Sequence, residues 1–329
     1  MVSRPAVASG RPTTVGALAR RGERWFSEAG LSYGHGTTNA RDEAIYLTLH
    51  ALGLPPTHFP TQQIVPVAQA ALVIELFTQR VERRTPAAYL TQEAWLGPHR
   101  FYIDERALVP RSYIAELLLQ QAVHCWPAKS RVRSALDLCT GSGCLAILLG
   151  KYFRQARIDA ADISADALDV ARINVRGHRL SQRIALVKSD YFRALKKRRY
   201  DLIISNPPYV RAAVMRKLPK EYRQEPSLGL AGGDDGLDAV RIILARAAEQ
   251  LNPGGTLVVE CGHARERVER TWPRLPFLWP ETSGGDDCVF VLSREDLVRS
   301  AGSAASGTLR ALAEKRSRAA LGPRGGRGA

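Results

Sequence analysis

The chain has 329 residues, of which 45% are hydrophobic and 24% are charged, and these values are typical of a globular protein with room for two domains. No apolar run is long enough to span a bilayer, and the first residues lack the apolar core of a secretory signal, so we expect a soluble, cytoplasmic protein without membrane contact. The formal net charge of +15 predicts a polyanionic partner, such as ribosomal RNA or a complex that contains it.

The cysteines are an odd set with no Cys-x-x-Cys pair and no histidines grouped at ligand spacing. They are Cys125, Cys139, Cys144, Cys261 and Cys288. This spacing indicates neither a disulfide framework nor a zinc site, and we expect no metal.

Helical spacing of apolar residues dominates the first part of the chain, after residues 1–12, which we expect to be disordered. Three apolar stripes within 13–85 predict a small helical bundle. Between Pro86 and Pro110 the period changes to short runs at 88–90 and 101–103 around a Gly-Pro turn, which predicts a β-hairpin connector over 86–111. A helix then follows, with Ser112 as its N-cap.

From residue 133 the chain alternates between strand and helix, which is typical of a doubly wound α/β sheet. The expected strands are 135–138, 157–163, 184–187, 202–204 and 256–259, with further strand-like runs at 276–278 and 289–292. The expected helices are 145–152, 165–175 and 236–251, the last being the most clearly amphipathic. Residues 297–329 are rich in Ala, Gly, Ser and Arg, and their composition predicts a disordered basic tail.

The stretch 200–210 combines a short buried strand with an abrupt stop. Its apolar run ends at Ser-Asn-Pro-Pro-Tyr (205–209), where two prolines stop the hydrogen-bonding ladder and stiffen the backbone. Ligands of open parallel sheets bind at the carboxyl ends of strands, and Asn206 is the side chain best placed there. Its amide can both accept and donate, which suits a planar partner that carries an NH2 group, either a carboxamide or the exocyclic amine of a base.

A glycine-rich turn, 137–144, lies between the first strand of this pattern and its helix. Such a turn lets a ligand approach the backbone closely, and the helix that follows offers N–H groups at its positive end. The third glycine of a dinucleotide motif is replaced by Ala146, a tolerated variant, so a dehydrogenase remains a minor alternative. Asp162 closes the next strand, placed to bind both hydroxyls of a ribose, and Asp190 closes the one after, where an adenine amino group would lie.

Together, the glycine loop, the acidic strand ends and Asn-Pro-Pro-Tyr resemble S-adenosylmethionine-dependent methyltransferases that alkylate amide or exocyclic nitrogen. Within these, residues 85–297 resemble the bacterial glutamine N(5)-methyltransferases. One branch of that family acts on peptide-chain release factors, and the other acts on the third protein of the large ribosomal subunit. The segments 108–117, 218–226 and 230–238 are similar to the ribosomal branch.

The chain departs from this family pattern at three positions and in its long basic tail. They are Gln92 where Gly is usual, Tyr113 where Pro is usual and Gln224 where His is usual.

The resemblance implies a Rossmann-like class I methyltransferase domain at 112–296 with a mainly parallel, seven-stranded sheet, and a substrate-recognition role for 13–85. It implies S-adenosylmethionine as cofactor, held by Asp137, Thr140, Gly141, Ser142, Gly143, Asp162, Ile163, Asp190, Tyr191 and Asn206. It also implies that Arg111 borders the pocket and contacts the substrate. The implied partner is the large-subunit ribosomal protein, either free or within assembling ribosomes, and RNA contact is expected through the basic tail.

The expected catalytic and substrate-binding residues are Asn206, Pro207, Pro208 and Tyr209. A glutamine amide is a weak nucleophile, because its nitrogen lone pair is delocalised into the carbonyl, and no side-chain base could remove its proton at pH 7. Positioning must therefore provide the rate. We expect the Asn206 oxygen and the Pro207 carbonyl to accept the two amide hydrogens, with Tyr209 packed on the amide plane.

Three alternatives remain open on the sequence alone. A release-factor glutamine methyltransferase would share the same chemistry. An adenine-N6 methyltransferase shares the Asn-Pro-Pro-Tyr pattern and would use base flipping, although the helical N-terminal part is no nucleic-acid reader that we identify. A non-catalytic ribosome-assembly factor could keep the fold, but intact Asn206, Gly141 and Gly143 argue against it.

Overall fold

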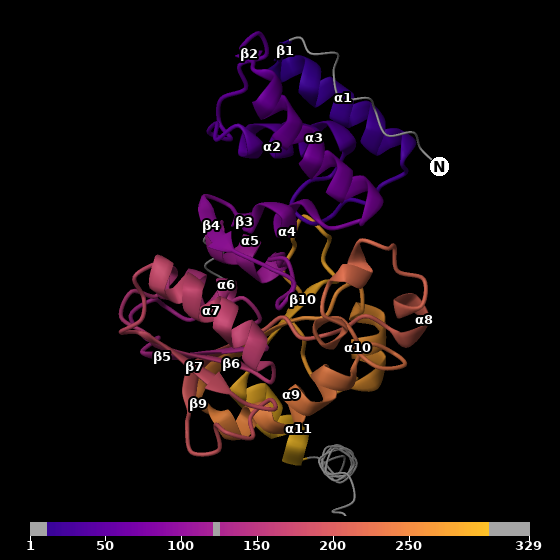
Figure 1. Ribbon diagram of the computed structural model, residues 1–329. Coiled ribbons are helices and arrows are strands. Elements are labelled where there is room, and N and C mark those ends of the chain that lie inside the picture. The colour runs from indigo at the N-terminus through magenta and orange to yellow at the C-terminus, as the bar shows by residue number, and fades with distance from the viewer. Residues whose placement is uncertain (1–11, 121–125, 303–329) are drawn as a thin grey trace, which may run out of the picture. The chain divides into compact units, whose positions relative to one another are not determined.

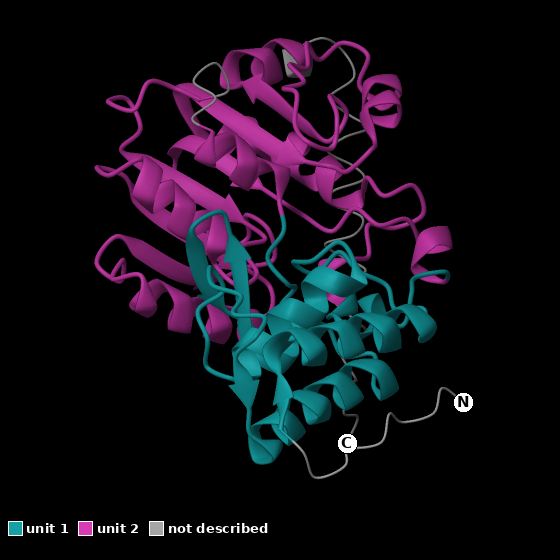
Figure 2. Ribbon diagram, turned by 90° about the horizontal axis from the view of Figure 1, so that it is seen from above, with its two compact units in different colours: residues 1–111, 217–227 teal, residues 112–216, 228–329 magenta. Residues whose placement is uncertain are grey.

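The computed structural model describes residues 12–120 and 126–302, and the elements are labelled in Figure 1. The chain divides into two compact units, coloured in Figure 2. Unit 1 comprises residues 1–111 and 217–227, and unit 2 comprises 112–216 and 228–329. The segment Lys217–Ser227, which the sequence places inside the methyltransferase domain, thus belongs to unit 1.

Unit 1 is mainly helical, as its apolar periodicity predicts. Its elements are β1 (Thr13–Thr14), α1 (Val15–Glu28), α2 (Ala40–Ala51), β2 (Ile64–Val65), α3 (Val67–Glu82), α4 (Ala87–Thr91), β3 (Glu93–Leu96), β4 (His99–Tyr102) and the 3-10 turn Tyr222–Gln224. The side chains of Thr14 and Asn39 cap α1 and α2 by accepting N–H groups of the first turn. In the core, the rings of Phe26 and Phe77 meet edge to face with centroids 5.0 Å apart, so α1 and α3 bury their apolar stripes together.

The expected hairpin connector is only partly a hairpin. Strands β3 and β4 pair antiparallel around the Gly97-Pro98 turn, as predicted. The run at 88–90, expected to be extended, instead lies in the helix α4. A run of three residues is too short for its periodicity to distinguish a strand from one helical turn. Pro86 directly precedes the helix, where the fixed φ of proline is tolerated.

Unit 2 is an α/β domain, which confirms the predicted fold class. Its elements are α5 (Tyr113–Leu119), β5 (Ser134–Leu138), α6 (Cys144–Tyr152), β6 (Arg157–Asp162), α7 (Ala165–Gly177), β7 (Ile184–Lys188), β8 (Tyr200–Ser205), α8 (Ala212–Met215), α9 (Asp238–Gln250), β9 (Leu251–Glu260), α10 (Arg265–Thr271), β10 (Val289–Ser293) and α11 (Arg294–Gly302). A further 3-10 turn, Ser227–Gly229, begins in unit 1 and ends in unit 2. Ser112 caps α5 as expected, accepting the Ile114 N–H at 3.1 Å.

The sheet of unit 2 has the strand order β10-β9-β8-β5-β6-β7, and every pair is parallel except β9 with β10. Within the described residues it has six strands rather than the expected seven. The run 276–278 contributes only an isolated bridge between Leu278 and Val291. Prolines 273, 276 and 280 around this run cannot donate to a ladder, which keeps it from extending.

The amphipathic face of α9 packs into the main core of unit 2 as predicted, because Val240, Ile243 and Ala247 are fully buried with the sheet residues Ile203 and Leu257. The start of the expected tail is corrected. Leu297 is buried in the same core within α11, so the ordered chain continues to residue 302, and the rest of the expected tail lies outside the described residues. The expected disorder of residues 1–11 also lies outside them. No helix in the described ranges is long and apolar enough to cross a membrane.

Candidate cofactor and substrate site

The carboxyl ends of the parallel strands bring the predicted acidic residues to one edge of the sheet. Leu138 of β5 lies in register with Ala161 of β6 and Ser205 of β8. Backbone bonds continue the ladder beyond the strands, from the Thr140 N–H to the Ala161 carbonyl at 3.0 Å and from the Ser189 N–H to the Asp162 carbonyl at 2.8 Å. The loops that follow β5 and β7 are therefore both fastened to the end of β6.

Asp137 is completely buried near the end of β5, and one of its two carboxylate oxygens accepts hydrogen bonds. Its Oδ2 accepts the Thr140 hydroxyl at 2.5 Å and the Ala146 N–H at 2.9 Å, while its Oδ1 has no hydrogen-bond partner among the described residues. Burial raises the pKa of Asp137 to about 7, although the two hydrogen bonds act in the opposite direction. A buried carboxylate with a vacant oxygen is poised to receive a cationic or hydrogen-bond-donating ligand group.

The glycine loop is held from two sides. Asp162 accepts the Gly141 N–H with Oδ2 at 2.8 Å and the Ser164 N–H with Oδ1 at 2.9 Å, so it anchors the loop to the end of β6. Burial raises the pKa of Asp162, and these backbone hydrogen bonds oppose the shift. Gly143, with φ of 79°, precedes α6, and a Cβ there would lie 3.0 Å from the Cβ of Ala171. Glycine is thus required by both conformation and space.

Three further predicted cofactor residues, Ile163, Asp190 and Tyr191, follow the ends of β6 and β7. Ile163 follows β6 with 46% of its surface exposed, so this apolar side chain is open to solvent. Tyr191 has φ of 46°, and its carbonyl accepts the Ser189 hydroxyl at 2.6 Å. Asp190, between Ser189 and Tyr191, is partly buried. It lies in a loop whose backbone is hydrogen-bonded to β6 through Ser189.

The Asn-Pro-Pro-Tyr segment leaves β8 next to the glycine loop, because the Ser205 hydroxyl donates to the Leu138 carbonyl at 2.7 Å. Asn206 is partly buried and Pro207 is buried. The Tyr209 hydroxyl donates to Oε1 of Glu260 at 3.2 Å, which fixes the ring at the far end of the segment.

Glu260 is a site residue that the sequence analysis missed. It ends β9 with a buried side chain, and its Oε2 accepts the Ser112 hydroxyl at 2.6 Å and the Tyr113 N–H at 2.9 Å. Burial raises its pKa, with these hydrogen bonds opposing the shift. Tyr113 thus supplies Glu260 with an N–H that a proline at this position would lack. The signal in the sequence that could have identified Glu260 is its position as an acidic residue directly after the predicted strand 256–259.

Three glycines enclose Tyr209. A Cβ at Gly232 would lie 2.6 Å from the Tyr209 Cα, one at Gly236 would lie 2.5 Å from its carbonyl oxygen, and one at Gly262 would lie 2.9 Å from its ring. Val210 also forms an isolated β-bridge with Ala231, which closes the loop that contains the segment Lys217–Ser227. Tyr209 is therefore held in one position by backbone on several sides.

Arg111, predicted to contact substrate, is engaged within unit 1. Its guanidinium binds both oxygens of Glu225, a side chain with no exposed surface, at 2.7 and 2.6 Å. The neighbouring Glu221 accepts from Arg80 at 3.4 Å and from Arg84 at 3.3 Å. Two carboxylates of the segment Lys217–Ser227 thus anchor it in unit 1, and neither stood out in the sequence, because their partners are distant in the chain.

Several known proteins are similar to this chain. The Methyltransferase small domain family matches residues 115–219. Ribosomal protein uL3 glutamine methyltransferases are similar to nearly the whole chain: that of Neisseria gonorrhoeae is 49% identical over 87% of this chain and 96% of its own length, and that of Burkholderia pseudomallei is 46% identical over 88% and 97%. Among solved structures, the hMettl16 catalytic domain aligns at 18% identity with a TM-score of 0.46, over 68% of this chain and 79% of that chain. Because the curated relatives match across almost their full length, the chain belongs to the family of ribosomal protein uL3 glutamine methyltransferases.

Proposed function

We propose that this protein transfers a methyl group from S-adenosylmethionine to the side-chain amide nitrogen of a glutamine in ribosomal protein uL3, in the cytoplasm. The observation that supports this most is the end of β8, where Asn206-Pro-Pro-Tyr is held between the glycine loop and Glu260. Relatives named for this activity match the chain at up to 49% identity.

The residues present fit the cofactor. The vacant Oδ1 of buried Asp137 suits the ammonium group of S-adenosylmethionine, and the exposed Ile163 side chain suits its adenine. Asp162 keeps one lone pair on each oxygen for the ribose hydroxyls while its other lone pairs hold the Gly141 and Ser164 N–H groups. When bound, the cofactor supplies an electrophilic methyl group on a sulfonium.

The rate enhancement rests on positioning of the acceptor amide. The Asn206 carboxamide oxygen and the Pro207 carbonyl accept its two hydrogens and turn its lone pair toward the transferred methyl group. Both acceptors also stabilise the positive charge that develops on nitrogen during transfer, because they are fixed dipoles at the end of a rigid strand. Tyr209, held by Glu260 at 3.2 Å, packs on the amide plane and excludes water from it.

The decisive experiment compares Asn206→Ala with the wild type on purified uL3, with methylation measured by mass spectrometry and cofactor affinity by calorimetry. We expect Asn206→Ala to abolish transfer and to leave cofactor affinity nearly unchanged, because the lost interaction belongs to the acceptor and the transition state. Asn206→Asp keeps an acceptor oxygen, and partial activity of that variant would assign the role to the oxygen. Near wild-type transfer by Asn206→Ala would refute the proposed site.

The substrate is tested separately in cells. Mass spectrometry should compare ribosomal proteins and release factors from strains with and without this protein. One glutamine of uL3 should be lighter by about 14 Da, the mass added by a methyl group, in the strain without it. Loss of methylation on a release factor or on adenine in nucleic acid, with uL3 unchanged, would identify one of the alternative substrates. Assays on free uL3 and on assembling ribosomes, with a chain truncated after residue 302, separate the reaction from RNA contact by the basic tail.

A further inference from the structure

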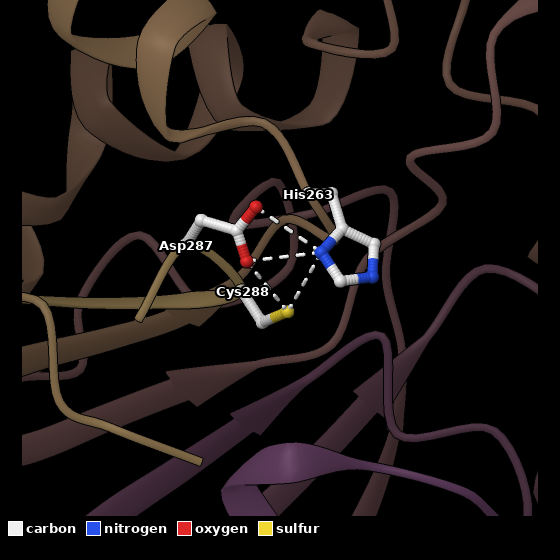
Figure 3. Close-up of side chains that lie close together, drawn as sticks. All are labelled: His263, Asp287 and Cys288. Atoms are coloured by element: carbon white, nitrogen blue, oxygen red, sulfur yellow. Dashed lines mark hydrogen bonds and ion pairs between the residues drawn. The ribbon is translucent and has the colours of Figure 1, made fainter. Parts of the chain in front are cut away.

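A cluster of three potential metal ligands lies in unit 2, where β9 and β10 pair. His263 follows the end of β9, and Asp287 and Cys288 precede β10. Their ligand atoms all lie within 4.8 Å of one another. Figure 3 shows the three side chains turned toward one another. The sequence indicated no metal site here because 25 residues separate His263 from Cys288, a spacing that matches no short zinc motif.

The distances within the cluster are close to those of a tetrahedral site. Nδ1 of His263 lies 2.9 Å from Oδ1 of Asp287 and 3.6 Å from Sγ of Cys288, and the sulfur lies 3.3 Å from the same Oδ1. With zinc bonds of about 2.0 Å to nitrogen and oxygen and about 2.3 Å to sulfur, tetrahedral ligand atoms are about 3.3–3.6 Å apart. The three side chains therefore need to open by only a few tenths of an ångström to admit an ion.

One ring nitrogen of His263, Nδ1, faces both the Asp287 carboxylate and the Cys288 sulfur. Nδ1 also lies 3.1 Å from Oδ2 of Asp287, yet it carries at most one hydrogen, so it can satisfy only one neighbour at a time. In Figure 3 the second ring nitrogen of His263 points away from Asp287 and Cys288, which leaves it able to hold the imidazole proton while Nδ1 binds an ion.

An ion can reach the cluster from solvent, and neighbouring backbone supports the cluster. The side chains of His263 and Asp287 are 65% and 36% exposed, so an ion can enter from solvent and keep a water as its fourth ligand. Cys288 is fully buried, and its carbonyl accepts the Cys261 N–H at 2.8 Å, which holds the backbone at Cys288 in place. The described cysteines, including Cys288, are free thiols.

We propose that His263, Asp287 and Cys288 form a zinc-binding site. The donor set of nitrogen, sulfur and oxygen selects a borderline-soft ion of this kind and disfavours Mg²⁺ and Ca²⁺, which take oxygen ligands. Binding forms three bonds to the ion, releases the Cys288 thiol proton to solvent and leaves the neutral imidazole with its proton on Nε2. The bound ion clamps the segment before β10 to the end of β9, three residues from Glu260.

Co²⁺ titration of the full-length, chelator-treated protein tests the site. We expect one equivalent per chain with a thiolate-to-cobalt charge-transfer band in the near ultraviolet, displaced by Zn²⁺. Cys288→Ser should remove the band, and His263→Ala should weaken Zn²⁺ binding by at least about 100-fold. His58→Ala is the matched control, since His58 is exposed in unit 1 and belongs to no such cluster among the described residues, and it should bind as the wild type does.

Stability supplies a second readout that needs no activity. Saturating Zn²⁺ should raise the melting temperature of the wild type and of His58→Ala but not that of His263→Ala, whose surface substitution should not prevent folding. Co²⁺ binding without a thiolate band, or equal Zn²⁺ affinity in the wild type and His263→Ala, would overturn the proposal and leave the cluster as a hydrogen-bonded ion pair.

Discussion

Arg111 and Glu225 are 114 residues apart in the sequence and form a bidentate ion pair within unit 1, with N···O distances of 2.7 and 2.6 Å. Glu225 also accepts the Val109 N–H at 3.0 Å, and Nε2 of His35 lies 3.3 Å from it. The pair thus joins the end of the connector to the returning segment Lys217–Ser227.

Arg111→Ala should destabilise unit 1 by about 3 kcal/mol, because it leaves the buried Glu225 carboxylate without its main counter-ion. Hydrogen exchange of unit 1 peptides, followed by mass spectrometry, measures the loss. Arg100→Ala is the control, since Arg100 pairs with Glu93 while its side chain is 68% exposed, and we expect that variant to lose less than about 1 kcal/mol. Equal effects of the two substitutions would show that the Arg111 pair adds no special stability.

Glu225 should also make unit 1 sensitive to acid. Burial alone would raise its pKa, but the bonds from His35 and Arg111 outweigh burial and lower the pKa to about 2. A lowered folded-state pKa means that the stabilisation is complete above about pH 4.5 and is lost as the pH falls toward 2. Glu225→Gln should flatten this part of the stability profile, measured by hydrogen exchange between pH 2.5 and 6. A variant as acid-sensitive as the wild type would assign the effect to other carboxylates.

Cofactor affinity should depend on the protonation of Asp137. Its pKa is raised to about 7, so the neutral form predominates below that pH and cannot attract the cationic S-adenosylmethionine. We expect affinity by calorimetry to rise by up to about tenfold per pH unit below pH 7 and to level off above it. Asp137→Asn should bind more weakly with no such slope. Asp166→Asn, at an exposed position of α7, should keep the wild-type profile, and a slope in Asp137→Asn would exclude Asp137 as its origin.

Tyr209→Phe should lower kcat about tenfold and leave cofactor affinity unchanged, because it removes a hydroxyl that anchors the Asn-Pro-Pro-Tyr segment to Glu260. The matched control lies at the start of β8, the strand that leads into this segment: the Tyr200 hydroxyl donates to Asp159 at 2.6 Å. Tyr200→Phe should cost stability and leave kcat intact at 25 °C. A wild-type kcat in Tyr209→Phe would mean that ring packing alone holds the segment.

Gln92→Gly should stabilise the protein by up to about 1 kcal/mol. Gln92 ends α4 with φ of 53°, a left-handed conformation that glycine adopts without steric cost. Thermal unfolding measures the gain, and Gln79→Gly within α3 should instead destabilise by about 1 kcal/mol. Destabilisation by Gln92→Gly would show that the exposed Gln92 side chain makes a contribution larger than its backbone strain.

Residues that are close in the sequence account for most of what could be predicted. The alternation of strand and helix after residue 133, the glycine loop and the Asn-Pro-Pro-Tyr stop all depend on side-chain spacing and backbone conformation over a few residues. Parallel strand order then brings Asp137, Asp162 and Asp190 to the same edge, because the carboxyl ends of parallel strands align. Predictions failed where a run was too short for its period to be read, as at 88–90 and 276–278.

Only the tertiary structure decided which distant charged groups meet. Glu221, Glu225 and Glu260 have no local pattern that separates them from exposed glutamates, yet all three are buried and paired with groups at least 51 residues away. The same holds for His263 and Cys288, which come together only when β9 and β10 pair. Local spacing determines the backbone period, because its interactions span a few residues. The partner of a buried charge depends on which surfaces fold against each other, since burial without a partner would cost several kcal/mol.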